Sequence, residues 1–165
     1  MKNALLISCL LLAAVAAEGA LAQAPAPAVT STLQARRVDS VAGKAVLAPA
    51  EAGKPGDLLE YSGTYRNGAQ RSVERMVATI PVPAGTTFVA GSAEPARATA
   101  STDGAQFAPL PLMRSVRLAD GTTRQEAVPL SEYRYVRWEI GTLPAGGEAV
   151  VKLRVQIDAA ATAAR

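Results

Sequence analysis

The sequence predicts an all-β protein built as an antiparallel sandwich of about seven to nine strands. Three observations predict this fold class. Short stretches of the chain alternate between apolar and polar residues, turn residues separate these stretches about every 8 to 12 positions, and no stretch shows convincing helical periodicity. A closed barrel is the structural alternative.

The clearest pair of strands lies within residues 133–157. Two alternating stretches are joined there by turn residues at 143–147, and alternation over such a length indicates a sheet with one face buried and the other in water. From this pair and the strands before it we expect the following core residues: Leu59, Tyr61, Ile80, Phe88, Val136, Trp138, Ile140, Val151, Leu153 and Val155.

The N-terminus has the three parts of a secretory signal peptide. A short positive start precedes a continuous apolar run at residues 4–17, and Ala-Leu-Ala at 20–22 has the small-x-small pattern of a cleavage site. We therefore predict a signal peptide over residues 1–22, cleaved between Ala22 and Gln23.

Two other interpretations of this N-terminus are disfavoured. The apolar run is shorter than the roughly 20 residues that a membrane-spanning helix requires. A lipoprotein would need a cysteine directly after the run, whereas Cys9 lies inside it. We expect an exported protein, located in the periplasm or outside the cell, without a transmembrane segment in its mature chain.

The mature chain divides into three parts. Residues 23–33 are expected to form an Ala/Pro-rich linker, residues 34–157 the β-sandwich domain, and residues 158–165 a disordered tail. Tight turns are signalled most strongly by Asn67-Gly68 and by Asp120-Gly121. Strands are expected in these segments, of which the first is a weak signal: 33–47, 58–66, 72–82, 86–90, 96–101, 113–118 and 122–128.

The composition excludes several kinds of chemistry. The chain has no histidine, and its one cysteine, Cys9, lies in the segment expected to be removed. A mature chain without thiol or imidazole has no disulfide, no cysteine zinc site and no histidine-based triad. The serines and lysines show no Ser-x-x-Lys spacing, and the net charge of +3 is spread without a basic block. We therefore expect a protein that is not an enzyme, binds no cofactor and has no nucleic-acid partner.

Several motifs occur in a recognisable order. They are KPGD at 54–57, NG at 67–68, IPVPAGTTFVAGS at 80–92 and VRWEIGTLPAGG at 136–147. Over residues 45–157 the chain thereby resembles the bacterial repeat family called domain of unknown function eleven. The resemblance implies an immunoglobulin-like sandwich in an exported or cell-surface protein, without catalytic residues. An aspartate common before the third motif is missing here, and the single copy suggests a free-standing protein rather than a stalk.

Two groups of residues are candidates for binding. Asp57, Asp103 and Asp120 each lie beside a glycine in a turn, where a carboxylate either binds calcium or caps its own turn. We favour the cap and expect no metal.

Tyr133, Tyr135 and Arg137, with Arg114 and Arg134 near them, mix aromatic and basic groups on one stretch of chain. They form either a candidate binding face or ordinary cross-strand pairs on a wet sheet. The sequence thus predicts a structural or protein-interaction component of the cell envelope, with an unknown envelope or surface protein as partner. The alternative is a binding module for carbohydrate or another small ligand.

Overall fold

The computed structural model describes residues 28–51 and 53–159. The expected signal peptide, its cleavage site at Ala22 and Gln23 and the first part of the linker lie outside these residues, as does most of the expected tail. Within the described residues the chain forms eleven strands and a single 3-10 turn. The all-β, antiparallel prediction is confirmed. No helix in this part of the chain is long and apolar enough to cross a membrane.

The strands form two main sheets and one separate hairpin. The five-stranded sheet has the order β2 (Lys44–Pro49), β1 (Val29–Val41), β3 (Leu58–Asn67), β11 (Glu148–Ile157) and β5 (Thr86–Phe88). The four-stranded sheet has the order β4 (Val73–Pro81), β10 (Tyr135–Leu143), β6 (Thr99–Ser101) and β7 (Ala108–Pro109). The hairpin consists of β8 (Met113–Arg117) and β9 (Thr123–Ala127).

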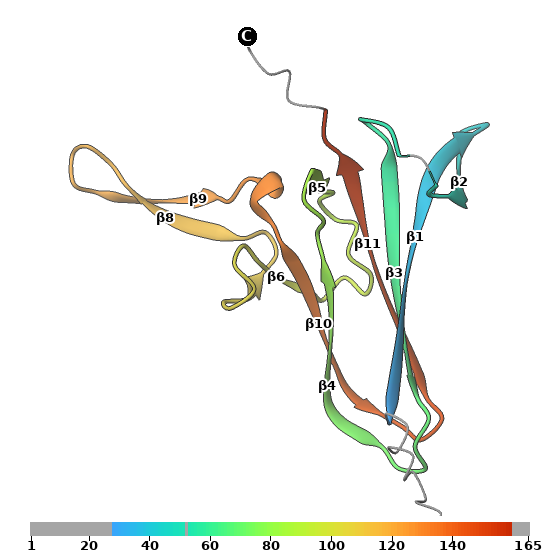
Figure 1. Cartoon of the computed structure of the whole chain (residues 1–165). Helices are drawn as coiled ribbons and strands as arrows, with labels where there is room; N and C mark the ends of the chain where they lie inside the picture. The colour runs from blue at the N-terminus through green and yellow to red at the C-terminus, as the bar shows by residue number, and fades with distance from the viewer. Residues whose placement is uncertain (1–27, 52, 160–165) are drawn as a thin grey trace, which may run out of the picture.

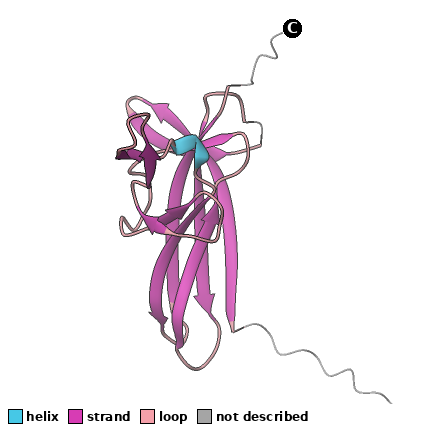
Figure 2. Cartoon of the chain, turned by 90° about the vertical axis from the view of Figure 1, so that its left-hand side faces the viewer, coloured by secondary structure: helices cyan, strands magenta, loops and turns pink. Residues whose placement is uncertain are grey.

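The two sheets face each other across one core, as Figure 1 shows from the side and Figure 2 after a quarter turn. Eight of the ten expected core residues are buried, and Tyr61 and Ile140 pack against the cluster while partly exposed. Trp138 is the largest buried side chain, at 2% exposure. Its indole Nε1 donates to the carbonyl of Pro95 at 2.8 Å, so its one polar atom is satisfied.

The chain crosses between the sheets at Asn67. A tight turn was expected at Asn67-Gly68, but β3 and β4 lie in different sheets, so this segment is a sheet-to-sheet connection and not a hairpin turn. The Asn67 side chain is buried, at 1% exposure. Its Nδ2 lies within 3.0 Å of three backbone carbonyls, those of Arg71, Leu143 and Pro144.

The turn at 143–147 is the second crossing, because β10 and β11 also lie in different sheets. Asn67 therefore joins both crossings: its backbone N–H donates to Gly147 and its carbonyl accepts from Gly146. Figure 1 shows the two connections side by side at one end of the molecule. A single buried amide thus fixes the sheets to each other at that end.

Strand β1 starts earlier than the sequence predicts. It begins at Val29, so residues 29–33, expected within the linker, lie in the five-stranded sheet. They pair with β3, from Val29 opposite Asn67 to Arg37 opposite Leu59. No residue of β1 or β2 is buried, and Figure 1 shows both strands at the margin of the sandwich. Backbone pairing with β3, not burial, holds this strand in place.

The hairpin predicted around Asp120-Gly121 is confirmed, and Figure 1 shows it projecting from the sandwich as an arm. Its base is anchored by Leu112 and Val128, which are buried, and the Val128 N–H donates to the Leu112 carbonyl at 2.8 Å. At the other terminus, Asp158 was expected to be disordered. Its backbone N–H donates to Gly85 at 2.9 Å, which extends the ordered chain past β11.

Candidate functional site

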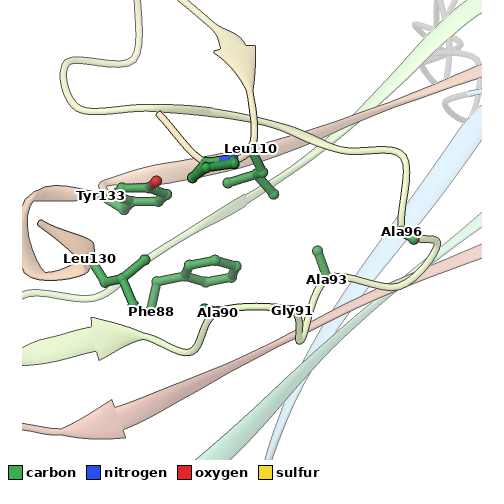
Figure 3. A pocket seen from close by; sticks show the side chains of 9 residues that line it. Phe88, Ala90, Gly91, Ala93, Ala96, Leu110, Leu130 and Tyr133 are labelled. Atoms are coloured by element: carbon green, nitrogen blue, oxygen red, sulfur yellow. The ribbon is translucent and has the colours of Figure 1, made fainter. Parts of the chain in front are cut away.

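An apolar pocket lies at the end of the sandwich from which the arm projects. Its volume is about 370 Å³. Figure 3 shows Tyr133 and Leu110 on one side and Phe88 and Leu130 across from them, with the small residues Ala93 and Ala96 at the far end. We call this site the apolar pocket. The walls offer hydrocarbon and aromatic surface, which suits an apolar group and no charged one.

Tyr133 forms part of the pocket wall and is fully buried. Its ring stacks on Phe88 with a centroid separation of 5.5 Å and an interplanar angle of 9°. Its hydroxyl accepts a hydrogen bond from the Leu112 N–H at 2.7 Å, so it also anchors the base of the arm. The prediction that Tyr133 belongs to an exposed binding face is therefore wrong.

The reason lies in the 3-10 turn η1 (Leu130–Glu132), which directly precedes Tyr133. Alternation along a strand holds only within the strand, and β10 begins at Tyr135. The turn directs Tyr133 into the core, whereas Tyr135 and Arg137 lie on the outer face of the four-stranded sheet.

The other members of the expected aromatic and basic group are also separated. Arg114 lies on the arm and forms an ion pair with Glu132 at 3.1 Å. The Arg134 guanidinium donates to the backbone carbonyls of Ser131 and Tyr133. Tyr135 is 37% exposed, and its ring covers Gly104, where an added Cβ would lie 2.8 Å from the ring. Of the five residues, only Tyr135 and Arg137 remain neighbours on one face.

Arg137 borders a second depression, which we call the arginine groove. Its volume is about 500 Å³, and its polar lining consists of Arg97, Thr99, Arg137 and Glu139. The Arg137 guanidinium lies over the Phe107 ring, 3.3 Å from the ring centroid, as in a cation–π pair. Its Nε is buried and has no hydrogen-bond partner among the described residues.

The three turn aspartates cap their own turns, as the favoured interpretation had it. The Asp103 carboxylate accepts from the N–H groups of Gln106 and Ala105, and these bonds together with that of the Ser101 hydroxyl hold the pKa of Asp103 below its ordinary value. Asp57 and Asp120 accept from nearby N–H groups in the same manner. Among the described residues, no group of three or more His, Cys, Asp or Glu is placed to hold a metal ion.

Sequence reasoning named Phe88, Tyr133 and Arg137 but missed most of the other residues that line the two depressions. Ala93, Arg97 and Leu110 come from residues 91–111, where no alternation marks which side chains point inward. The one signal was the density of small and apolar residues in a long connection. Comparison of the chain with family models, with curated proteins and with solved structures finds no significant match.

Proposed function

We propose that this chain is a non-catalytic, exported module that binds a protein partner of the cell envelope, and that the apolar pocket is where the partner docks. The finer interpretation of the fold is part of the proposal: an immunoglobulin-like sandwich related to domain of unknown function eleven. Its support is the order of sequence motifs and the two facing antiparallel sheets. Export is supported by the three-part N-terminal sequence.

The observation that carries the proposal is the apolar pocket itself. Its only side-chain polar atom is the Tyr133 hydroxyl, which is already engaged by the Leu112 N–H. Acid–base and nucleophilic catalysis require a titratable group within reach of a substrate. A pocket of this composition instead suits an apolar anchor side chain from a partner, the kind of contact that dominates binding energy in protein interfaces.

The arm adds a second surface beside the pocket. Nearly all of its residues are exposed, with only Val116 and Glu126 partly buried. An isolated two-stranded hairpin is marginally stable in water, so this arm gains order from its anchored base. Tyr133 is both a pocket wall and the anchor of that base, so one side chain connects the pocket with the arm.

Site-specific photo-crosslinking in the cells that produce the protein tests this function. A photoreactive amino acid replaces Ala90, an exposed residue at the pocket, and in a matched control it replaces Ala145, in the turn at the opposite end. We expect one dominant protein adduct from position 90, none from position 145, and loss of the adduct when Ala96→Trp fills the pocket mouth. Identical adducts from both positions, or none from either, contradict the proposal.

A second candidate function is the binding of a carbohydrate or another small ligand at the Tyr135 and Arg137 face. The observation in its favour is the exposed Tyr135 ring next to Arg137, because sugars stack on aromatic rings beside polar groups. A glycan array measured with wild type and with Tyr135→Ala tests it. Signals that the substitution leaves unchanged, or no signal at all, remove this function.

A further inference from the structure

The apolar pocket and the arginine groove adjoin each other. Ala96 and Leu110 line both. Both residues come from segments next to the short β6–β7 pair, which carries the wall between the two depressions. A single ligand that crosses this wall therefore contacts hydrocarbon on one side and guanidinium groups on the other.

The arginine groove carries unbalanced positive charge. Six ion pairs link described residues, and none of them includes Arg97, Arg137 or Glu139. Two guanidinium groups against one carboxylate leave the groove one positive charge in excess. A planar guanidinium matches a carboxylate through two parallel N–H bonds.

Arg137 is also held in place before any ligand arrives. Its guanidinium lies over the Phe107 ring, and this contact restrains a side chain that is otherwise rich in rotamers. A side chain that is already ordered loses less entropy on binding, which favours affinity. Exposed Arg97, by contrast, is free to swing toward a bound anion.

We propose that the pocket and the groove together bind the C-terminal residue of the partner protein. The apolar side chain of that residue enters the pocket, and its α-carboxylate pairs with Arg97 and Arg137. A C-terminal residue carries a side chain and a carboxylate on the same carbon atom, which matches two depressions that share a wall. This inference rests on the proposed protein-binding function and specifies the chemistry of the partner.

The negative charge of Glu139 is expected to affect carboxylate binding in the opposite direction to the positive charge of Arg97. Glu139 is exposed and lies in the groove on the same face of β10 as Arg137. Its negative charge opposes a bound carboxylate. Removing that charge is therefore expected to strengthen binding, whereas removing Arg97 weakens it.

The experiment is an NMR titration of amide shifts in the 15N-labelled mature protein. The probes are N-acetyl-leucine, its neutral counterpart N-acetyl-leucinamide, and N-acetyl-glycine, which keeps the carboxylate and lacks the side chain. N-acetyl-leucine is expected to bind with a Kd on the order of 1 to 10 mM, with shifts around residues 96–99 and 108–111. The two counterparts are expected to bind at least about fivefold more weakly, since each loses one half of the contact.

Three substitutions complete the test. Arg97→Gln is expected to raise the Kd of N-acetyl-leucine about threefold to tenfold, as loss of a partly exposed charge pair does, and Glu139→Gln to lower it. Arg36→Gln, at an exposed arginine of β1 in the other sheet, is the matched control and is expected to have no effect. Equal affinity for the acid and the amide, or indifference to both groove substitutions, overturns the proposal.

Other outcomes identify other occupants. Octanoate that binds where N-acetyl-leucine does not assigns the site to a free apolar carboxylate and overturns capture of a chain terminus. A crosslinked envelope protein without binding of N-acetyl-leucine leaves the proposed function standing and removes this inference. If N-acetyl-leucine binds and no protein is crosslinked, the proposed protein partner is removed. The pocket and the groove then remain as a binding site for small apolar acids.

Discussion

Replacement of Asn67 by alanine is expected to destabilise the fold by about 3 to 5 kcal/mol. The two hydrogens of its Nδ2 are shared among the carbonyls of Arg71, Leu143 and Pro144, and its Oδ1 accepts from the Ala69 N–H. Each buried bond contributes roughly 1 kcal/mol net, and a buried carbonyl that loses its donor adds a desolvation cost. Against a total stability of about 5 to 15 kcal/mol, this loss is large.

The assay is urea unfolding followed by the fluorescence of Trp138, the only tryptophan in the chain. Gln125→Ala is the matched control, because it removes an exposed amide that bonds only to Ser115 on the arm, and a change within about 0.5 kcal/mol is expected. Asn67→Asp keeps the shape of the side chain but points a carboxylate at three carbonyl oxygens.

The cost of Asn67→Asp relative to wild type is expected to grow as the pH rises. Facing carbonyl oxygens in a buried site favours the protonated carboxyl, so its folded-state pKa lies above its unfolded value and ionisation destabilises the fold. A cost below about 1 kcal/mol for Asn67→Ala, similar to that of Gln125→Ala, would refute the reasoning that this amide ties the two crossings together.

Three further predictions follow from single side chains. Trp138→Ala is expected to cost about 3 to 5 kcal/mol in urea unfolding, monitored by circular dichroism, because it empties the largest buried volume; a cost near 1 kcal/mol contradicts this. Tyr133→Phe removes the acceptor of the Leu112 N–H, so that amide and those of the arm are expected to exchange hydrogen faster while the core strands keep their protection. Backbone N–H groups, that of Gln106 most strongly, donate to the Asp103 carboxylate and lower its pKa in the folded protein. The stability that Asp103 contributes is therefore present above the ordinary aspartate pKa and is lost as the pH falls through the lower pKa of the folded state. Asp103→Asn is expected to weaken the fall in the free energy of unfolding at acidic pH, measured by urea unfolding at several pH values. An unchanged dependence on pH would contradict this prediction.

The strands and the core were predictable because their signals are local. Alternation in residues 149–157 places Val151, Leu153 and Val155 on one face, whatever strand lies beside them. Asp120-Gly121 also gave a correct hairpin, since both flanking strands pair only with each other.

Pairings between distant segments were not predictable in the same way. A two-residue turn motif indicates how the backbone bends and not which sheet the next strand joins. Asn67-Gly68 is therefore compatible both with a hairpin and with a crossing between sheets. The role of Asn67 depends on carbonyls at Leu143 and Pro144, more than seventy residues away in the sequence. Tyr133 was predicted on the wrong face because it lies two residues before Tyr135, where β10 begins. Residues two apart share a face only when both lie within the strand.

The candidate site shows the same limit. Its residues converge from β5, from the connection between β5 and β8, and from η1, and none of these short pieces has a periodicity that points toward a shared cavity. Arg137 was identified because it lies on a regular strand. Arg97 was not, because only the fold brings it beside Arg137.

Strand β1 has a consequence for how such a sequence changes over evolutionary time. With no buried residue in β1, its place in the sheet depends on the backbone alone, and most side-chain replacements there leave the core untouched. The facing strand β3 is constrained by Leu59 and Asn67, both buried. Substitutions are therefore expected to accumulate fastest at residues 29–41, so that two such proteins would keep the same first strand long after its sequence had ceased to reveal it.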